Sequence, residues 1–284
     1  MTVWQAIVLG IVQGLTEFLP VSSSAHLIVV PWLLGWESPG LAFDAALHLG
    51  TLTAVLAYFW RDLLAMARAL PRALRRPMAM LQSAEPEDVV PRLVLLIGLG
   101  TVPALVIGLL GQDWIEAVYH PEGATPDRVI IFVAVALIGL ALILLWAERA
   151  ARHVRGLASL RLPDAVAIGF AQAAALIPGV SRSGATITAG LWRGLARADA
   201  ARFSFLLGTP IVAAAGAKGL YDTLNAGLDA NQLGIFAVGL VASALAGFAA
   251  IWSLLRYLQR ASTIVFIVYR IGLGIVLFAL VVLR

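Results

Sequence analysis

The chain has 284 residues, of which 61% are hydrophobic and only 13% are charged. A soluble domain is about 45–50% apolar and about 25% charged, so this chain has too little polar material to cover a water-soluble globule. It contains no cysteine, which excludes disulfides, thiolate zinc sites and iron–sulfur centres. The net charge of +4 does not indicate a nucleic-acid partner, because the basic residues lie in short segments between apolar runs. The composition therefore indicates an integral membrane protein.

Several apolar runs are long enough to cross a bilayer, which takes a helix of about 20 residues. They lie at about 41–60, 93–111, 128–148, 203–221, 233–254 and 262–283. Two further regions, 1–35 and 162–195, are apolar but interrupted near the middle by Pro, Gly and Ser. Irregular backbone survives at membrane depth only when protein or a wet cavity covers it. We therefore expect an all-α polytopic membrane protein with six transmembrane helices and two re-entrant helical hairpins.

The charged segments predict an orientation. Arginines concentrate in 61–92 and 149–161, whereas acidic residues dominate 112–127 and 222–232. Arginine-rich segments stay in the cytoplasm, so the acidic segments are expected outside. Six crossings, with hairpins that return to their side of entry, place both termini outside. The first residues lack a basic region, so we do not expect a cleaved signal peptide.

The two halves of the chain resemble each other. Residues 6–13 align with residues 165–172, and the same offset continues into both interrupted regions, where it aligns Ser22 with Ser181 and Ser24 with Ser183. Each half holds one hairpin and three spans, and because three is odd the second copy must be inverted. Inverted repeats with broken helices place a polar site near the bilayer midplane.

The repeat therefore predicts one membrane domain, 1–284, made of inverted-topology repeats at about 1–148 and 160–284. We call the interrupted segments 13–26 and 178–186 the first and second hinge.

The first hinge carries groups suited to chemistry on an anion. Gln13 and Glu17 are four residues apart and share one helix face. An ionisable group at membrane depth costs at least a few kcal/mol, which makes Glu17 a functional candidate. Its carboxylate could hold Mg²⁺ or Ca²⁺ together with phosphate oxygens and water. Further candidates are the hydroxyl nucleophiles Ser22, Ser23 and Ser24, and His26 as base, acid or nucleophile.

The second hinge is suited to binding an anion. Pro178-Gly179 breaks the helix, and Arg182 follows directly before a new helix is expected to begin. The N–H groups at a helix start attract phosphate, and a guanidinium can hold phosphate through two hydrogen bonds. Further donors are the hydroxyls of Ser181, Ser183 and Thr186. The expected ligand is a phosphate-bearing molecule reached from within the membrane.

Each candidate residue of the two hinges could also have a purely structural role. A serine run can satisfy backbone groups at a kink, a lone intramembrane Glu can relay protons or ions, and an Arg near a hairpin tip can reach toward the membrane surface. Because these groups converge on two matched hinges, an anion site is favoured over the separate explanations.

The two hinges resemble the signature segments of the undecaprenyl-pyrophosphate phosphatase family of the bacitracin-resistance type. That family has a Glu or Gln followed after three residues by Glu, matched by Gln13 and Glu17, and the pattern Pro-Gly-x-Ser-Arg-Ser-x-x-Thr, matched by residues 178–186. Secondary matches are Phe43-Asp44, residues 47–51, residues 202–208 and Tyr269-Arg270. The resemblance covers essentially the whole chain.

The resemblance implies an enzyme of the bacterial inner membrane that removes the terminal phosphate of undecaprenyl pyrophosphate, and so regenerates the lipid carrier of cell-wall synthesis. It implies a catalytic set of Glu17, Ser23, His26 and Arg182, with Gln13, Ser181, Ser183 and Thr186 in support. Ser22 and Ser24 join the expected substrate-binding residues. The family's active site faces the periplasm, and its members dimerise. Some members have Glu at position 13, so the metal ligand set here is thinner by one carboxylate.

Two questions stay open at this point. Either Ser23, activated by His26, or His26 itself could attack the terminal phosphorus. Inverted repeats with broken helices are also typical of transporters, so a carrier of the lipid phosphate is the alternative function. The roles of Asp44, His48 and Arg270 are not predicted.

Overall fold

The computed structural model describes residues 1–38, 40–111, 126–225 and 229–283. These residues are almost entirely helical and contain no strand beyond one isolated bridge, between Arg155 and Leu195. The helices are α1 (Val3–Phe18), α2 (Ser23–Leu34), α3 (Gly40–Tyr58), α4 (Trp60–Arg75), α5 (Pro77–Gln82), η1 (Pro86–Asp88), α6 (Val89–Leu110), α8 (Asp127–Ala150), η2 (Leu157–Ser159), α9 (Leu162–Ala174), α10 (Arg182–Trp192), α11 (Arg197–Asn225), α12 (Ala230–Leu258) and α13 (Ile264–Val282). The all-α class is therefore confirmed.

Five of these helices are long and apolar enough to cross a membrane within the described residues: α6, α8, α11, α12 and α13. The sixth expected span, at about 41–60, corresponds to α3, which meets the length only together with α4, and the two are bent by 80°. The bend falls at Phe59, whose ring is buried against Phe205 and the neighbouring Tyr58. The predicted span therefore ends at Tyr58, before the bend.

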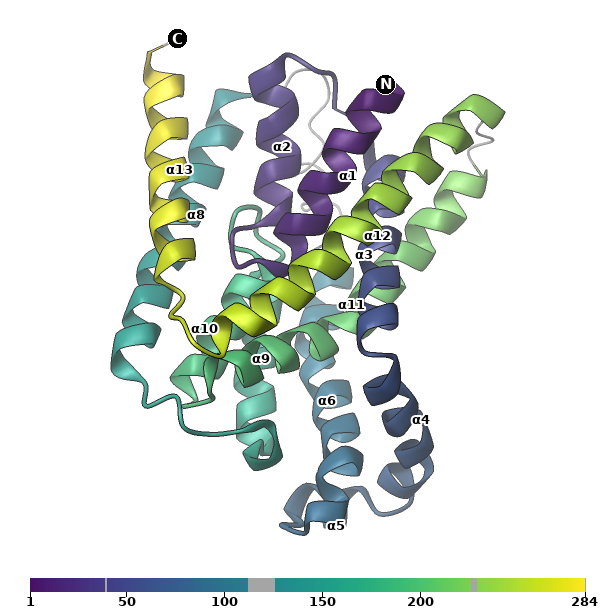
Figure 1. Ribbon diagram of the computed structural model, residues 1–284, viewed down its shortest axis with the longest axis vertical. Coiled ribbons are helices and arrows are strands. Elements are labelled where there is room, and N and C mark those ends of the chain that lie inside the picture. The colour runs from purple at the N-terminus through teal and green to yellow at the C-terminus, as the bar shows by residue number, and fades with distance from the viewer. Residues whose placement is uncertain (39, 112–125, 226–228, 284) are drawn as a thin grey trace.

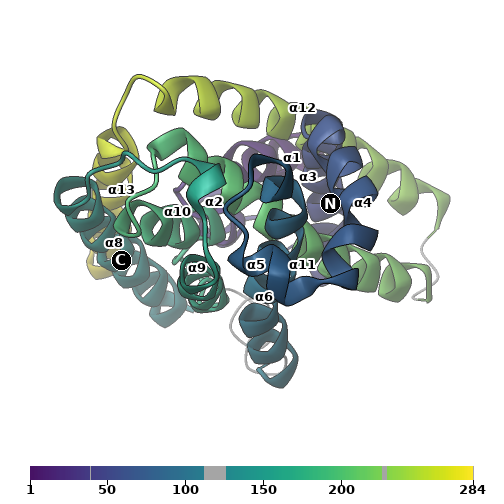
Figure 2. The ribbon, with the colours of Figure 1, turned by 90° about the horizontal axis from the view of Figure 1, so that it is seen from below.

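The segment 61–92, expected as a charged loop, is mostly helical. Figure 1 shows α4, α5 and the start of α6 together at the lower end of the molecule. Seen from below in Figure 2, α8 and α13 lie side by side at one end, and α12 runs along one edge. Most of the acidic segment 112–127, and part of 222–232, lie outside the described residues.

Both interrupted regions form pairs of short helices, as predicted: α1 with α2, and α9 with α10. The first helix of each pair packs closely against a long helix at a glycine, and the sequence repeat aligns these two glycines. A Cβ on Gly10 of α1 would lie 2.5 Å from the carbonyl oxygen of Gly239 of α12, and one on Gly169 of α9 would lie 2.5 Å from that of Gly100 of α6. Because no side chain fits at these contacts, each first helix lies directly against a long helix. The two contacts occur at glycines that the sequence repeat aligns, while the repeat itself and the inverted orientation of its halves stay predictions.

The turn of each hairpin has the same local geometry. Ser22 and Ser181 both have positive φ, 79° and 77°, which is unusual for residues other than glycine. Each caps the following helix: the Ser22 hydroxyl accepts from the N–H of Ala25, and the Ser181 hydroxyl from that of Gly184. The two serines that the sequence repeat aligns, Ser22 and Ser181, therefore cap the second helix of each hairpin in the same way.

Buried ion pairs hold the loops around the second hairpin. Asp164, at the start of α9, is 1% exposed and accepts from Arg155 and Arg193, with the shortest distance to each 2.7 Å. Burial by itself raises the pKa of Asp164, but the two guanidinium groups hold the pKa below its usual range. Arg155 also exchanges backbone hydrogen bonds with Gly194 and Ala196. This network fixes the base of the hairpin that carries Arg182.

Candidate functional site

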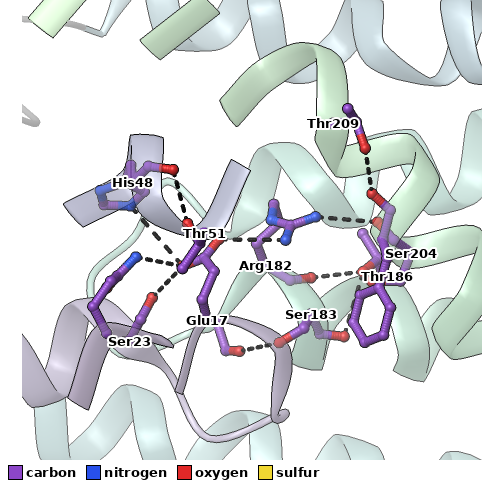
Figure 3. A network of polar contacts seen from close by, with 12 residues as sticks. Glu17, Ser23, His48, Thr51, Arg182, Ser183, Thr186, Ser204 and Thr209 are labelled. Carbon is purple, nitrogen blue, oxygen red and sulfur yellow. Dashed lines mark hydrogen bonds and ion pairs between the residues drawn. The ribbon is translucent and has the colours of Figure 1, made fainter. Parts of the chain in front are cut away.

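The two hinges meet at Glu17 and Arg182. Glu17, near the end of α1, is 6% exposed, and its Oε1 accepts a hydrogen bond of 3.3 Å from Nη2 of Arg182, the first residue of α10. Its Oε2 accepts from the Ser23 hydroxyl at 2.6 Å (Figure 3). The same oxygen accepts from Nε2 of Gln13 at 3.2 Å. The carboxylate of the first hinge and the guanidinium of the second hinge are therefore in direct contact.

A second contact joins the hinges directly. The hydroxyl of Ser183 in α10 donates to the carbonyl of Leu19, which follows α1, at 3.0 Å. The Phe18 ring beside it packs edge-on against Phe205 of α11, with ring centroids 5.3 Å apart. These contacts hold the end of α1 against α10 and α11, so the Glu17–Arg182 pair rests on a packed support.

Arg182 is oriented by α11. Its Nη1 donates to the carbonyl of Ser204 at 3.1 Å, and the Ser204 hydroxyl lies 2.6 Å from that of Thr186. A Cβ at Gly208 would overlap the guanidinium, so the side chain can lie there only because residue 208 is glycine. Nε of Arg182 is buried and has no hydrogen-bond partner among the described residues. The guanidinium therefore keeps an unused donor.

The charged pair lines a small cavity. The other lining residues that carry its chemistry come from α3 and α11: Thr51, Gly208 and Thr209. Of the predicted hydroxyl donors, Ser22 and Ser181 are used as helix caps, while Thr186 donates to the carbonyl of Arg182. Ser24 and Ser183 lie 3.1 and 3.2 Å from the cap hydroxyls of their own hinges. These hydroxyls build the hinges, and Ser23 is the one that contacts the carboxylate.

Comparison with known proteins shows the family of this chain. A family model described as "Bacitracin resistance protein BacA" matches residues 6–276. The chain belongs to the BacA family. It is 52% identical over 281 residues to an undecaprenyl-diphosphatase of Thermomicrobium roseum, covering 99% of both chains. An undecaprenyl-diphosphatase of Synechococcus elongatus is 48% identical over 95% of this chain and 90% of its own, and one of Desulforudis audaxviator is 44% identical over the full length of both. The transporter alternative finds no support in these relatives.

His26 does not join the charged pair in this BacA-family protein. Its Nδ1 lies 2.6 Å from the carbonyl oxygen of Ser22, and its Nε2 lies 2.7 Å from the hydroxyl of Tyr269 in α13. The two rings are nearly parallel, with an interplanar angle of 8°. Both ring nitrogens thus have partners, and within the described residues neither contacts Ser23 or Glu17. In this arrangement His26 connects α2 to α13.

The imidazole nearest to the carboxylate belongs to His48. Its Nε2 lies 3.9 Å from Oε2 of Glu17, and its Nδ1 lies 2.7 Å from the carbonyl of Asp44, one turn earlier in α3. The sequence predicts no role for His48, because nothing in a single apolar helix shows which groups its polar residue will face. The signals in the sequence are an ionisable side chain inside a predicted span and its place in the secondary match at residues 47–51.

Arg270 ties both hinges to α13. The guanidinium is fully buried and donates to Pro20 of the first hinge at 3.3 Å and to Gly179 and Val180 of the second at 2.8 and 3.2 Å, through their carbonyl oxygens. It also donates to Leu137 of α8 at 3.1 Å. Because backbone carbonyls carry partial negative charge, they can stabilise a cation without a carboxylate. This answers the open role of Arg270: it holds the two turns together.

Gln13 and Glu17 are the residues that could hold a divalent cation. Oε1 of Gln13 is buried and has no hydrogen-bond partner among the described residues. It lies on the same helix face as the Glu17 carboxylate, so the pair offers oxygen donors of the kind that Mg²⁺ and Ca²⁺ prefer. No cluster of three or more His, Cys, Asp or Glu occurs in the described part of the chain. The residues therefore fit a cation whose remaining ligands are water and phosphate oxygens.

Proposed function

We propose that this chain hydrolyses undecaprenyl pyrophosphate to undecaprenyl phosphate and inorganic phosphate. The observation that carries the proposal is the contact of Glu17 with both Ser23 and Arg182: a nucleophile, its hydrogen-bond acceptor and a phosphate-binding cation lie in one place. The names of the full-length relatives support the same activity. It would recycle the lipid carrier for peptidoglycan, and bacitracin resistance follows because the antibiotic binds the pyrophosphate form.

Arg182 and the N–H groups at the start of α10 bind the phosphates. A guanidinium matches two phosphate oxygens at once, and the helix dipole adds positive potential at the same end. The unused Nε donor of Arg182 is available for this contact. Negative charge that develops on the phosphoryl oxygens is stabilised by these fixed donors, which need no reorganisation.

Ser23 is the proposed nucleophile. Its oxygen forms a bond to the terminal phosphorus while the bond from that phosphorus to the bridging oxygen breaks, so undecaprenyl phosphate leaves. The hydroxyl proton moves along the 2.6 Å hydrogen bond to Glu17. Water then attacks the phosphoserine and releases phosphate. This differs from activation of Ser23 by His26, because the ring nitrogens of His26 are hydrogen-bonded to Ser22 and Tyr269.

A divalent cation, Mg²⁺ or Ca²⁺, is proposed at Gln13 and Glu17. When bound, it supplies positive charge that neutralises the pyrophosphate and the leaving group. Gln13 would contribute an amide oxygen and Glu17 a carboxylate oxygen, and water and substrate phosphate oxygens would be the remaining ligands. Arg182 lies close enough to share the same phosphate.

The isoprenoid tail is proposed to enter sideways from the lipid. An apolar groove between α8, α9 and α10 reaches Val180, the residue before the Ser181 cap. Its walls include Phe132, Ile143 and Trp192. An apolar chain in this groove would lie next to the second hinge. From the family resemblance we also propose a homodimer in the inner membrane, surrounded by lipid, with the site open to the periplasm.

The test is phosphate release from undecaprenyl pyrophosphate by the purified protein in detergent with Mg²⁺ or Ca²⁺. Ser23→Ala and Glu17→Gln should each lose at least about 100-fold in kcat, because each removes a group that acts in the transition state. Ser253→Ala, on the exposed face of α12, is the matched control and should keep full activity. Near wild-type turnover of Ser23→Ala would overturn the mechanism, and absence of turnover in the unaltered protein would overturn the function.

A further inference from the structure

The helix α4 carries a basic stripe that the proposed function does not use. Arg61, Arg68 and Arg75 are spaced by seven residues, which is nearly two helical turns, so they lie along one line of α4. All three are exposed, and none forms an ion pair with another described residue. Arg72, beside this line, differs because it pairs with Asp88 at 2.8 Å.

An exposed apolar strip runs next to the basic stripe. At 100° per residue, Leu64, Trp60 and Leu74 lie on one side of the arginine line, rotated by about 40°, 80° and 120° from Arg68. Leu74 is 64% exposed and Trp60 is 55% exposed. The guanidinium of Arg61 lies over the Trp60 ring, 5.2 Å from its centroid. Solvent-exposed side chains of this size would be costly in water, whereas beside arginines they suit the boundary between acyl chains and headgroups.

The opposite side of α4 is fixed to the molecule. Leu63 and Met66 pack against the main hydrophobic core, and Ala73 is fully buried. Asp62 accepts a hydrogen bond of 2.5 Å from Arg202 of α11. The basic stripe and its apolar strip therefore have a defined direction, away from the core.

The direction of α4 suits a helix that lies along a membrane surface. Its axis departs by 80° from that of α3, the apolar helix that precedes it. When α3 crosses the bilayer, α4 then lies closer to the bilayer plane than to its normal. Figure 1 shows α4 at the lower end of the molecule beside α5 and α6, away from the hinges.

We propose that α4 is an interfacial helix that binds anionic phospholipid headgroups through Arg61, Arg68 and Arg75. Charge complementarity favours this occupant, because three aligned guanidinium groups without carboxylate partners among the described residues face outward beside an apolar strip. Lipid phosphates with net negative charge supply the missing anions, and acyl chains cover Trp60, Leu64 and Leu74. The proposal is independent of the phosphatase activity, because α4 contributes no residue to the hinge cavity.

The test is lipid binding by the full-length protein in detergent. Dioleoyl-phosphatidylglycerol and dioleoyl-phosphatidylcholine are titrated separately, and bound lipids are counted by native mass spectrometry. A basic residue near an anionic surface contributes about fivefold in affinity, so the triple variant Arg61→Gln, Arg68→Gln, Arg75→Gln should bind phosphatidylglycerol at least about tenfold more weakly. Its phosphatidylcholine binding and its unfolding temperature in phosphatidylcholine should be unchanged.

A matched control separates the stripe from net charge. The triple variant Arg149→Gln, Arg152→Gln, Arg260→Gln removes the same charge from exposed positions outside α4 and should bind phosphatidylglycerol like the unaltered protein. Three results would overturn the proposal. The two triple variants could lose phosphatidylglycerol affinity equally, or the α4 variant could lose none. The unaltered protein could also bind the two lipids with equal affinity. If the α4 variant unfolds, Arg68→Gln alone, with an expected loss of about fivefold, decides the question.

Discussion

Oε1 of Glu17 lies 3.3 Å from Nη2 of Arg182, although 165 residues separate them in the chain. The pair is mostly buried, with side-chain exposures of 6% and 13%. Each charge would be costly at this depth alone, so the contact between the two side chains offsets part of the cost of burying them. The pair thus links the folding of the two hinges to the assembly of the site.

Arg182→Lys should reduce kcat/KM for undecaprenyl pyrophosphate by at least about 100-fold. A lysine keeps the charge but cannot contact Glu17, the Ser204 carbonyl and a phosphate with one planar group. Phosphate release measured against Arg260→Lys, an exposed arginine after α12, checks this. Equal activity of the two variants would mean that Arg182 acts only as a point charge.

Gly208→Ala should lower activity by at least about tenfold while the protein still folds. The new Cβ would occupy the position of the Arg182 guanidinium and displace it from Glu17. Gly98→Ala in α6 is the control, since a Cβ there meets nothing within 4 Å. Phosphate release and the unfolding temperature of both variants are measured. Unchanged activity in Gly208→Ala would show that the guanidinium can move without loss of function.

The covalent intermediate should be a phosphoserine at Ser23. Protein quenched in acid after mixing with substrate labelled at the terminal phosphate should keep the label, since phosphoserine survives acid and phosphohistidine does not. Peptide mapping locates the label, and Ser23→Ala is the control that should remain unlabelled. Label that is lost in acid but kept in alkali would instead assign the attack to His26.

Tyr269→Phe should behave like a mild form of His26→Gln. Both remove the 2.7 Å contact between Nε2 of His26 and the Tyr269 hydroxyl, which ties α2 to α13. Loss of one such hydrogen bond should lower the free energy of unfolding by about 1 kcal/mol and reduce kcat through misplacement of the neighbouring Ser23. Chemical denaturation and phosphate release are measured on both variants. If His26→Gln abolishes turnover while Tyr269→Phe changes nothing, His26 acts in the reaction itself.

Removal of divalent cations with EDTA should abolish phosphate release, and Mg²⁺ or Ca²⁺ should restore it. Gln13→Leu should raise the cation concentration for half-maximal activity by about tenfold, because it removes the buried amide oxygen beside Glu17. Gln13→Glu is the informative partner variant and should lower that concentration, since a carboxylate binds Mg²⁺ more tightly than an amide. Activity that is insensitive to EDTA would contradict a cation at this position.

Asp164→Asn should destabilise the protein by about 3 kcal/mol, because two arginines lose their buried partner. The pKa of Asp164 is lower in the folded protein than in the unfolded chain, where it is about 4. The stabilisation by the Asp164 ion pairs is therefore complete above about pH 4, and it is lost as the pH falls through the lower folded-state pKa. The unfolding temperature of the unaltered protein should therefore fall below about pH 4. The variant should show a smaller fall over the same range.

The sequence alone determined the membrane class, the two hinges and the residues in them. These features are local: apolar runs of about 20 residues, helix breakers at Pro178-Gly179, and charges inside apolar segments can each be read without knowing what packs where. The motif match then added a family and a substrate class, which the full-length relatives support.

Only the tertiary structure decided which groups meet. The sequence favours His26, which lies in the first hinge, over His48, which lies in an apolar helix. The packing of α2 against α13 nevertheless places His26 against Tyr269, while α3 directs His48 toward Glu17. Likewise Gly208 gains its role only because Arg182 reaches across to α11. Side-chain partners depend on contacts between segments far apart in the chain, and helical periodicity within one segment carries no information about them.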